Sequence, residues 1–281
     1  LIVGFGPGTV SFINNLSKKK INNNVKVTII EKNIKNLYGG IAYSKNGCEY
    51  GFFNNPLRLS PANFRTWLNK KKNRYSSLKF LENIDNYSVK NWLSINKELF
   101  LKKENLNLFN EIYLPRVIYS FFLEDIFKVN NKIKLNLING KLLSFKSNKG
   151  KFFSKINFKK NHNFINKNFV YNNKIINQTI SDFLIINTSI VEPKNFGNIK
   201  NFKYISSFYE QGATSKLIKL IYANKKKIIK IGFLGSKAGF LEPLIEIYRL
   251  IKDGDKLISI TSFSQSGKTL EPASRLNFKN I

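Results

Sequence analysis

Cysteine and histidine are almost absent from this chain of 281 residues, which contains one of each and no methionine. A single cysteine, Cys48, cannot build a disulfide framework or a cysteine metal cluster, and this favours a reducing compartment such as the cytoplasm. The single histidine, His162, lies in a run of lysines and asparagines, and we interpret it as a solvated loop residue rather than a catalytic base. A histidine-based triad or a multi-histidine metal site is therefore excluded, and we expect no metal.

Long apolar runs are also missing. No segment reaches the roughly 18 uncharged apolar residues that a transmembrane helix requires, and no signal peptide is visible. The chain lacks methionine and begins inside an apolar strand, so we expect it to be a fragment of a longer protein. A hydrophobic share of 42% and an aromatic share of 14% indicate a globular chain that can form one large or two modest domains.

Acidic residues are few, with 17 Asp and Glu against 47 Lys and Arg, which gives a formal net charge of +30. Such a charge attracts nucleic acids and anionic membranes. However, the lysines are scattered, and they accompany asparagine, isoleucine and phenylalanine, which AT-rich codons also favour. We therefore interpret the charge as compositional drift over a solvated surface, and a nucleic acid partner is the less favoured alternative.

A strand–turn–helix–strand pattern opens the chain. Residues 1–3 are typical of the end of a buried strand, residues 9–17 carry apolar side chains at helical spacing, and the β-branched run 25–31 predicts a second strand. Two strands joined through a helix run parallel with a right-handed crossover. We predict an α/β, Rossmann-like fold with two dinucleotide-binding units, the second starting near residue 227, and an antiparallel β segment over 132–180.

A glycine-rich turn joins the first strand to the helix. Gly4 permits a tight turn, and Gly6 lets the backbone approach a pyrophosphate at the positive end of the helix. Thr9 occupies the position of the third glycine in the dinucleotide fingerprint. Gly8 beside it compensates in part for the missing glycine. A carboxylate at the end of the second strand accepts hydrogen bonds from ribose hydroxyls and repels a 2′-phosphate, although it could also be a plain surface carboxylate. The predicted adenine dinucleotide site consists of Gly4, Gly6, Pro7, Gly8, Thr9 and Glu31.

A second set of small residues follows the predicted strand 227–234 and precedes a predicted helix. Its spacing departs from the fingerprint, so an ordinary strand–helix turn is the alternative. The candidate contacts to a second nucleotide are Gly232, Gly235 and Ser236. Lys268, which follows a later strand and two serines, could receive a 2′-phosphate and so select NADPH.

The first turn together with Glu31 resembles the FAD site of flavoproteins with two dinucleotide domains. Residues 39–44, 53–56 and 64–68 follow in an order that resembles the FAD/NAD(P)-binding domain shared by bacterial flavin-dependent urate hydroxylases and aspartate N-monooxygenases. Residues 114–119 are similar to the Pro-Arg element of that group. Residues 187–189 correspond to its Ala-Thr-Gly, of which only the threonine matches.

This resemblance implies FAD as the prosthetic group, NAD(P)H as the reductant and often O2 as the oxidant. We accordingly divide the chain into an FAD-binding domain over 1–215 and a partial NAD(P)H-binding unit over 216–281. The resemblance adds the cofactor-binding candidates Gly40, Tyr43, Asn55, Arg116 and Thr188. Arg58 and Arg65 could also offset flavin or phosphate charge, with surface ion pairs as the alternative.

The expected function is that of an FAD-dependent NAD(P)H oxidoreductase, and within that class a monooxygenase that hydroxylates a small amine or heterocycle. Because the flavin carries the chemistry, a chain without a catalytic histidine or cysteine can still be an enzyme, and we name no catalytic side chain. The alternative function is a non-catalytic flavin- or nucleotide-binding module that docks on an acidic partner or RNA.

Overall fold

The computed structural model describes residues 1–20, 23–45, 51–129, 131–159, 170–171, 177–188, 204–205, 213–224, 228–235, 243–245, 247–248 and 257–264. Several residues of the sequence predictions lie outside these ranges, namely Cys48, His162, Ser189, Ser236 and Lys268. Among the described residues, the structure contains no helix that combines the length and the apolar character needed to cross a membrane.

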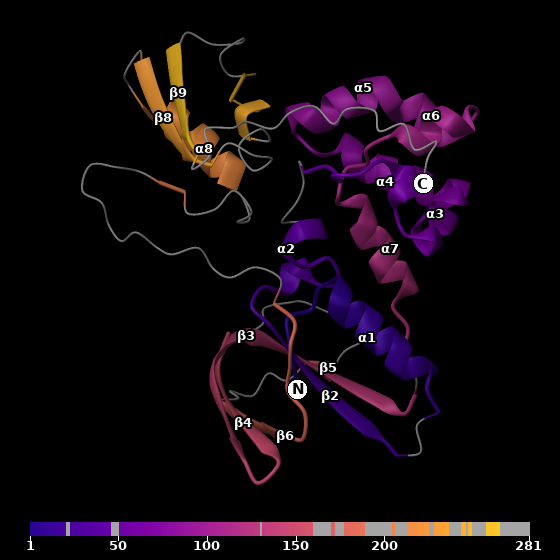
Figure 1. Ribbon diagram of the computed structural model, residues 1–281, viewed down its shortest axis with the longest axis vertical. Coiled ribbons are helices and arrows are strands. Elements are labelled where there is room, and N and C mark those ends of the chain that lie inside the picture. Colours follow the sequence, from indigo (N-terminus) through magenta and orange to yellow (C-terminus); the bar gives the residue numbers. More distant parts are fainter. Residues whose placement is uncertain are drawn as a thin grey trace.

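A seven-stranded sheet underlies the first part of the molecule (Figure 1), in the order β6-β4-β3-β2-β1-β7 with β5 also paired to β3. The strands are β1 (Ile2–Val3), β2 (Val25–Glu31), β3 (Ile133–Asn148), β4 (Lys151–Phe158), β5 (Val170–Tyr171), β6 (Gln178–Ser181) and β7 (Ile185–Ile186). Helix α1 (Pro7–Lys18) joins β1 to β2, which run parallel as predicted. The mixed α/β architecture confirms the Rossmann-like fold.

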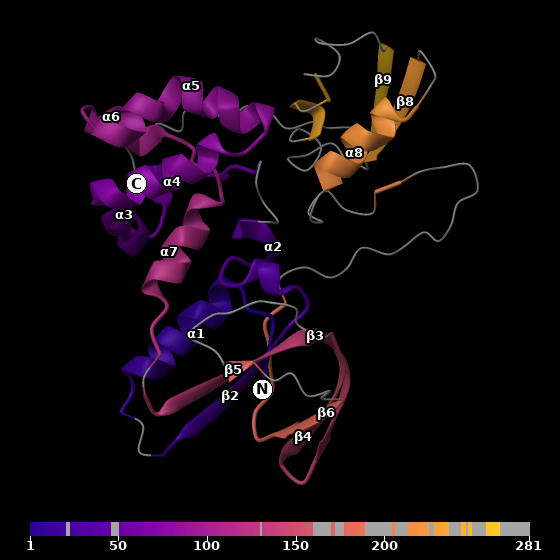
Figure 2. The ribbon, with the colours of Figure 1, turned by 180° about the vertical axis from the view of Figure 1, so that it is seen from behind.

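Both faces of the parallel strands are covered. Ile2 and Ile29 point to the face on which α1 packs with Val10, and α1 lies along this face in both Figure 1 and Figure 2. The neighbouring residues Val3 and Ile30 point to the opposite face, into a second apolar cluster. This alternation is the expected one for a strand, because successive side chains point to opposite sides of a sheet.

Strand β3 corrects one prediction. It is a single long strand whose first half pairs parallel with β2 and whose second half pairs antiparallel with β4, after a register shift between Leu142 and Ser144. The predicted antiparallel segment over 132–180 is thus confirmed for β4 and β6 and wrong for the first half of β3 and for β5, which pair in parallel. The alternation of a strand does not state the direction of its neighbour, which tertiary pairing decides.

The other helices of this part form a group next to α1, with α7 leading from the group towards the sheet (Figure 2). They are α2 (Gly40–Tyr43), α3 (Ala62–Asn69), α4 (Lys71–Glu82), α5 (Tyr87–Lys102), α6 (Leu106–Glu111) and α7 (Ile118–Ile126), with 3-10 turns at Ile34–Asn36 and Leu57–Leu59. The sequence predicts an irregular connection at Gly39 and Gly40 and a helix over 118–129. The structure corrects both predictions, because the two glycines open a helical turn and α7 ends at Ile126.

Buried polar bonds hold the helical group together. The indole N–H of Trp67 donates to Asp125 Oδ2 over 2.7 Å, and that of Trp92 donates to the Tyr113 carbonyl over 2.8 Å. Arg74, only 5% exposed, donates to carbonyls of Leu68, Asn69 and Leu101 at the ends of α3 and α5. Because the last carbonyls of a helix have no partner within it, this guanidinium satisfies the ends of two helices at once.

The last described part contains α8 (Ala213–Tyr222), β8 (Ile228–Leu234) and β9 (Leu257–Phe263). The two strands pair in parallel along their whole length, as predicted for the second unit. One face of the pair packs Ile229 and Phe233 against α8 and Ile247. Among the described residues nothing packs on the opposite face, and Leu234 on it is 82% exposed.

Candidate functional site

The turn between β1 and α1 requires glycine at its first position. Gly4 has φ +91°, and its N–H donates to the Ile30 carbonyl over 2.8 Å. A Cβ at this position would stand 2.6 Å from the backbone oxygen of Asn187. Both the left-handed backbone and the lack of space exclude any other residue, as the sequence predicts.

The N-terminus of α1 leaves two donors open. Gly6 is the N-cap residue, Pro7 follows it, and no side chain caps the helix. The Thr9 and Val10 amides bond to the Gly6 carbonyl, whereas the N–H groups of Gly6 and Gly8 donate to no other group in the described part of the chain. Open amides at the positive end of a helix form an anion site, so this turn can bind a phosphate.

Gly6 differs from Gly4 because the fold does not require it. Its φ of −97° suits any residue, and an added Cβ would lie 3.6 Å from the Gly40 Cα, an ordinary contact. A glycine without a conformational or packing reason is the one expected where a ligand approaches the backbone.

Glu31 lies beside this turn. The residue is 8% exposed, and its carboxylate accepts hydrogen bonds from the Phe5 N–H over 2.8 Å and the Asn33 N–H over 3.0 Å. Burial raises the pKa of Glu31, and the hydrogen bonds from the backbone at Asn33, Phe5 and Lys32 oppose that rise. The backbone N–H groups of Asn33, Phe5 and Lys32 use three of the four lone pairs of the carboxylate, so one position remains to accept a ribose hydroxyl. Glu31 is therefore not a plain surface carboxylate.

Helix α2 begins beside the turn between β1 and α1. Gly40 has φ +59°, and a Cβ on it would lie 3.3 Å from the Gly6 Cα. Tyr43, at the other end of α2, is half-buried, with its ring centroid 5.7 Å from that of Phe53 and 5.1 Å from that of Tyr119. The structure thus brings predicted site residue Gly40 against the turn and joins Tyr43 to an aromatic cluster.

Arg116 binds the loop of residues 51–54. Its backbone N–H donates to the Gly51 carbonyl over 2.8 Å, its Nε donates to the Phe52 carbonyl, and its Nη2 donates to Asn54 Oδ1 over 3.3 Å. The adjacent Asn55 is exposed. These contacts place Arg116 in support of the loop rather than against the glycine turn.

The other two candidate arginines lie on the surface. Arg58 Nε forms a salt bridge of 2.7 Å with Glu111, which fits the ion-pair alternative, and Arg65 Nη1 donates to the Arg58 carbonyl over 3.1 Å. Neither contact involves the turn.

Sequence reasoning missed the role of Asn187. This residue follows β7, and its side-chain Nδ2 donates to Thr9 Oγ1 over 2.8 Å, while its neighbour Thr188 is exposed. The signal was present, because both Thr9 and Asn187 depart from the pattern of the flavoproteins that the chain resembles. That the two departures touch each other is visible only in the fold.

The second predicted nucleotide-binding unit shows fewer features of a binding site among its described residues. Gly235 follows the last residue of β8 with φ +113°, its N–H donates to the Phe263 carbonyl over 2.7 Å, and an added Cβ would meet no atom of the described residues within 4 Å. Gly232 lies inside β8, paired with Thr261, rather than in the turn. The structure therefore puts Gly235 where a strand–helix turn would start and separates Gly232 from it.

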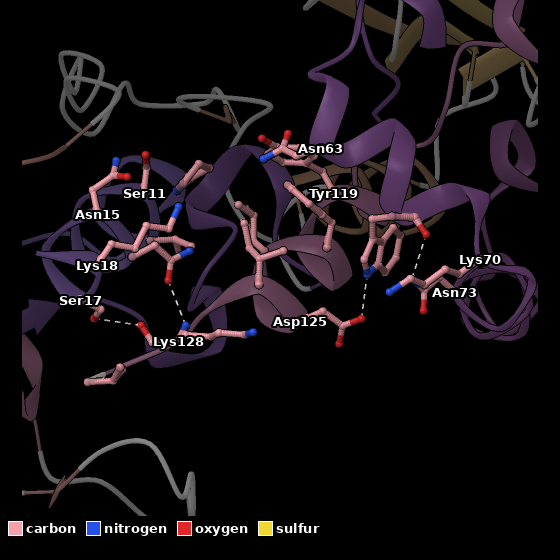
Figure 3. Close-up of a pocket in the computed structure, with 18 of the residues that line it drawn as sticks. Ser11, Asn15, Ser17, Lys18, Asn63, Lys70, Asn73, Tyr119, Asp125 and Lys128 are labelled. Carbon is pink, nitrogen blue, oxygen red and sulfur yellow. Dashed lines mark hydrogen bonds between the residues drawn. The ribbon is translucent and has the colours of Figure 1, made fainter. Parts of the chain in front are cut away.

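Residues of α1, α3, α4 and α7 line a groove of about 980 Å³ (Figure 3). Of the predicted site residues, it touches Pro7 alone. Four lysines line it, Lys18, Lys70, Lys72 and Lys128, among 19 lining residues. This share is close to that of 47 Lys and Arg in 281 residues, so the groove has no special positive charge.

The parallel strands, the open helix N-terminus and the carboxylate at the end of β2 define a dinucleotide-binding protein of Rossmann-like fold. A family model described as FAD-NAD(P)-binding matches residues 1–157. The chain belongs to this family, which supports binding of flavin and nicotinamide dinucleotides and a flavin-dependent oxidoreductase in general. No curated protein matched the chain in a sequence search. The boundary at residue 215 stays a prediction.

Proposed function

We propose that the chain binds FAD with its pyrophosphate at the N-terminus of α1 and its adenosine ribose at Glu31, as part of an oxidoreductase that NADPH reduces. The observation that carries this proposal is the pair of open amides at Gly6 and Gly8, with the Glu31 carboxylate beside the same turn. When bound, FAD supplies the redox chemistry, accepting a hydride from the nicotinamide and passing electrons on.

The charge of the site favours FAD over NADPH at this first position. Glu31 accepts the ribose hydroxyls and repels a phosphate on the 2′ oxygen, while the two amides and the helix dipole attract the pyrophosphate. NADPH then belongs to the second unit, for which the support is the parallel pair β8 and β9 and the turn that begins at Gly235.

Within this class we propose a monooxygenase that acts on a small amine or heterocycle. The support is the ordered resemblance of residues 39–44, 53–56, 64–68 and 114–119 to flavin-dependent hydroxylases. In the fold, the aromatic rings of Tyr43, Phe53, Phe64 and Tyr119 from these segments pack together. Such a cluster excludes water from its surroundings, which a flavin that reacts with O2 requires.

The test compares two glycine variants that the fold tolerates equally. Gly6→Ala leaves ordinary contacts but puts a methyl group where a pyrophosphate would lie, whereas Gly232→Ala adds a methyl 4.0 Å from the Phe263 ring on an open strand face. We expect Gly6→Ala to weaken FAD binding about tenfold or more and Gly232→Ala to leave the dissociation constant unchanged. The dissociation constants come from quenching of flavin fluorescence, and the free energies of unfolding from urea titrations.

Failure of the wild-type chain to bind FAD, or equal binding by Gly6→Ala, would overturn the proposal. With FAD bound, addition of NADPH should bleach the flavin absorbance and air should restore it. Bleaching without any hydroxylated product in a screen of amines and heterocycles would indicate a reductase or oxidase. Bound flavin that NADPH never bleaches would instead support the non-catalytic module.

A further inference from the structure

Asn187 and Thr9 meet at the turn, although 178 positions separate them in the sequence. Thr9 Oγ1 donates to the Gly4 carbonyl over 2.7 Å. Since a hydroxyl has one proton and this one goes to Gly4, Thr9 Oγ1 must accept from its other neighbour, which assigns that neighbour as the amide nitrogen of Asn187. The result is a directed chain of hydrogen bonds from Asn187 through Thr9 to Gly4.

The sheet holds Asn187 in place. Its backbone N–H donates to the Val3 carbonyl over 2.9 Å, directly after the parallel pairing of β7 with β1. Its carbonyl oxygen lies against the Gly4 Cα, and its side chain lies so close to Gly8 that an added Cβ there would be 2.6 Å from Nδ2. One residue therefore contacts three positions of the turn, namely Gly4, Gly8 and Thr9.

The burial of Thr9 explains why the turn needs the hydrogen bond from Asn187. In the dinucleotide fingerprint the third glycine lets the helix approach the strand, and here a threonine that is 1% exposed takes that position. A buried hydroxyl costs free energy unless it is hydrogen-bonded. Bonds to Gly4 and Asn187 satisfy Thr9 and tie the helix start to the sheet in place of glycine packing.

We propose that Asn187 is a positioning residue of the phosphate-binding turn, which through Thr9 holds the open amides of Gly6 and Gly8 in the arrangement that an FAD pyrophosphate requires. This inference rests on the proposed function. It assigns a role to a residue of the return strand at the position where the resembling flavoproteins have alanine.

A double-mutant cycle on the whole chain tests it, with FAD as the probe. We expect Asn187→Ala and Thr9→Ala each to raise the FAD dissociation constant about tenfold, and the double variant to bind no more weakly than either single one. Thr9→Ser keeps the hydroxyl and is the matched control, with binding near that of the wild type. Without FAD, amide hydrogen exchange over residues 4–10 should be faster in Asn187→Ala than in the wild type.

The outcomes separate the two claims. A wild-type chain that does not bind FAD overturns the proposed function and this inference with it. Wild-type binding together with unchanged binding by Asn187→Ala, even at a lower melting temperature, overturns the inference alone, because a purely structural residue changes stability and not affinity. The inference is also overturned if the FAD dissociation constant of the double variant is about a hundredfold above that of the wild type, because two independent effects would then multiply. Should Asn187→Ala not fold, Thr9→Ala against Thr9→Ser decides the same question.

Discussion

The two parallel strand pairs of this protein, β1 with β2 and β8 with β9, have similar local patterns and different surroundings. β1 is paired on both sides and packed on both faces, whereas the described part of the second pair has one packed face and one open face. Parallel sheets are normally buried on both faces. The comparison teaches that the same strand–glycine pattern gives a closed turn after β1, where Asn187 lies against it, and a more open turn after β8 among the described residues.

The first glycines of the two turns show the same difference. Both Gly4 and Gly235 have positive φ, but the backbone of Asn187 and Thr188 crowds Gly4, whereas no described residue lies within 4 Å of a Cβ on Gly235. We expect Gly4→Ala to lower the free energy of unfolding by about 3 kcal/mol or more, and Gly235→Ala by about 1–2 kcal/mol, since the second change costs backbone strain alone.

Urea titrations followed by circular dichroism measure both variants of this pair. Gly4→Ala should also lose FAD binding, and Gly235→Ala should keep it. Equal costs for the two changes would remove the distinction between a closed and an open turn.

A smaller effect is expected from the buried guanidinium that supports the first region. Arg74→Ala leaves carbonyls at the ends of α3 and α5 without a partner, and we expect a loss of about 2–3 kcal/mol. Arg58→Ala breaks an exposed ion pair with Glu111 and should cost about 1 kcal/mol or less. Unfolding followed by the fluorescence of Trp67 and Trp92 compares the two, and a cost for Arg58→Ala as large as for Arg74→Ala would contradict the assignment.

The carboxylate of the first site predicts a pH dependence of FAD binding. Because burial raises the pKa of Glu31 and ribose hydroxyls donate to its ionised form, FAD affinity should fall as the pH drops through that raised pKa and level off above it. Glu31→Gln should bind FAD about tenfold more weakly at pH 8 and show no such fall. The matched control is Glu111→Gln on the surface, which should retain the wild-type profile in fluorescence titrations from pH 8 to pH 5.

Without FAD, the Glu31 carboxyl affects the free energy of unfolding in the opposite direction, so that stability is higher at low pH. A carboxyl whose folded-state pKa is raised contributes stability below its unfolded pKa, and that contribution is lost as the pH rises through the folded pKa. Glu31→Gln should therefore reduce the fall in the free energy of unfolding between acid and neutral pH. An unchanged pH profile in that variant would contradict the raised pKa.

The smallest effect is expected on the open face of the second pair. Leu234→Ser replaces a side chain that is 82% exposed and should change the free energy of unfolding by about 0.5 kcal/mol or less. Phe233→Ala, one residue earlier on the packed face, should cost about 3 kcal/mol. A cost for Leu234→Ser as large as that for Phe233→Ala would show that this face is covered in solution, and the contrast between the two regions would fail.

Much of the first site could be predicted from the sequence, because its parts are local. Gly4 is set by backbone geometry within one turn, Gly6 follows from the dinucleotide fingerprint, and Glu31 follows from its place at the end of an alternating strand. The parallel direction of β1 and β2 also follows from the helix that connects them. The two arginines 58 and 116 could not be assigned, since their partners lie 53 and 64 positions away.

The sequence by itself determined the strand–glycine–helix–carboxylate unit, because each of its constraints acts within about thirty consecutive residues. Only the tertiary structure decided that β3 changes from parallel to antiparallel pairing and that Asn187 returns beside β1 to satisfy Thr9 and crowd Gly4. The physical reason is that hydrogen bonds and steric limits between distant segments depend on how the sheet is assembled, and no local pattern encodes that order.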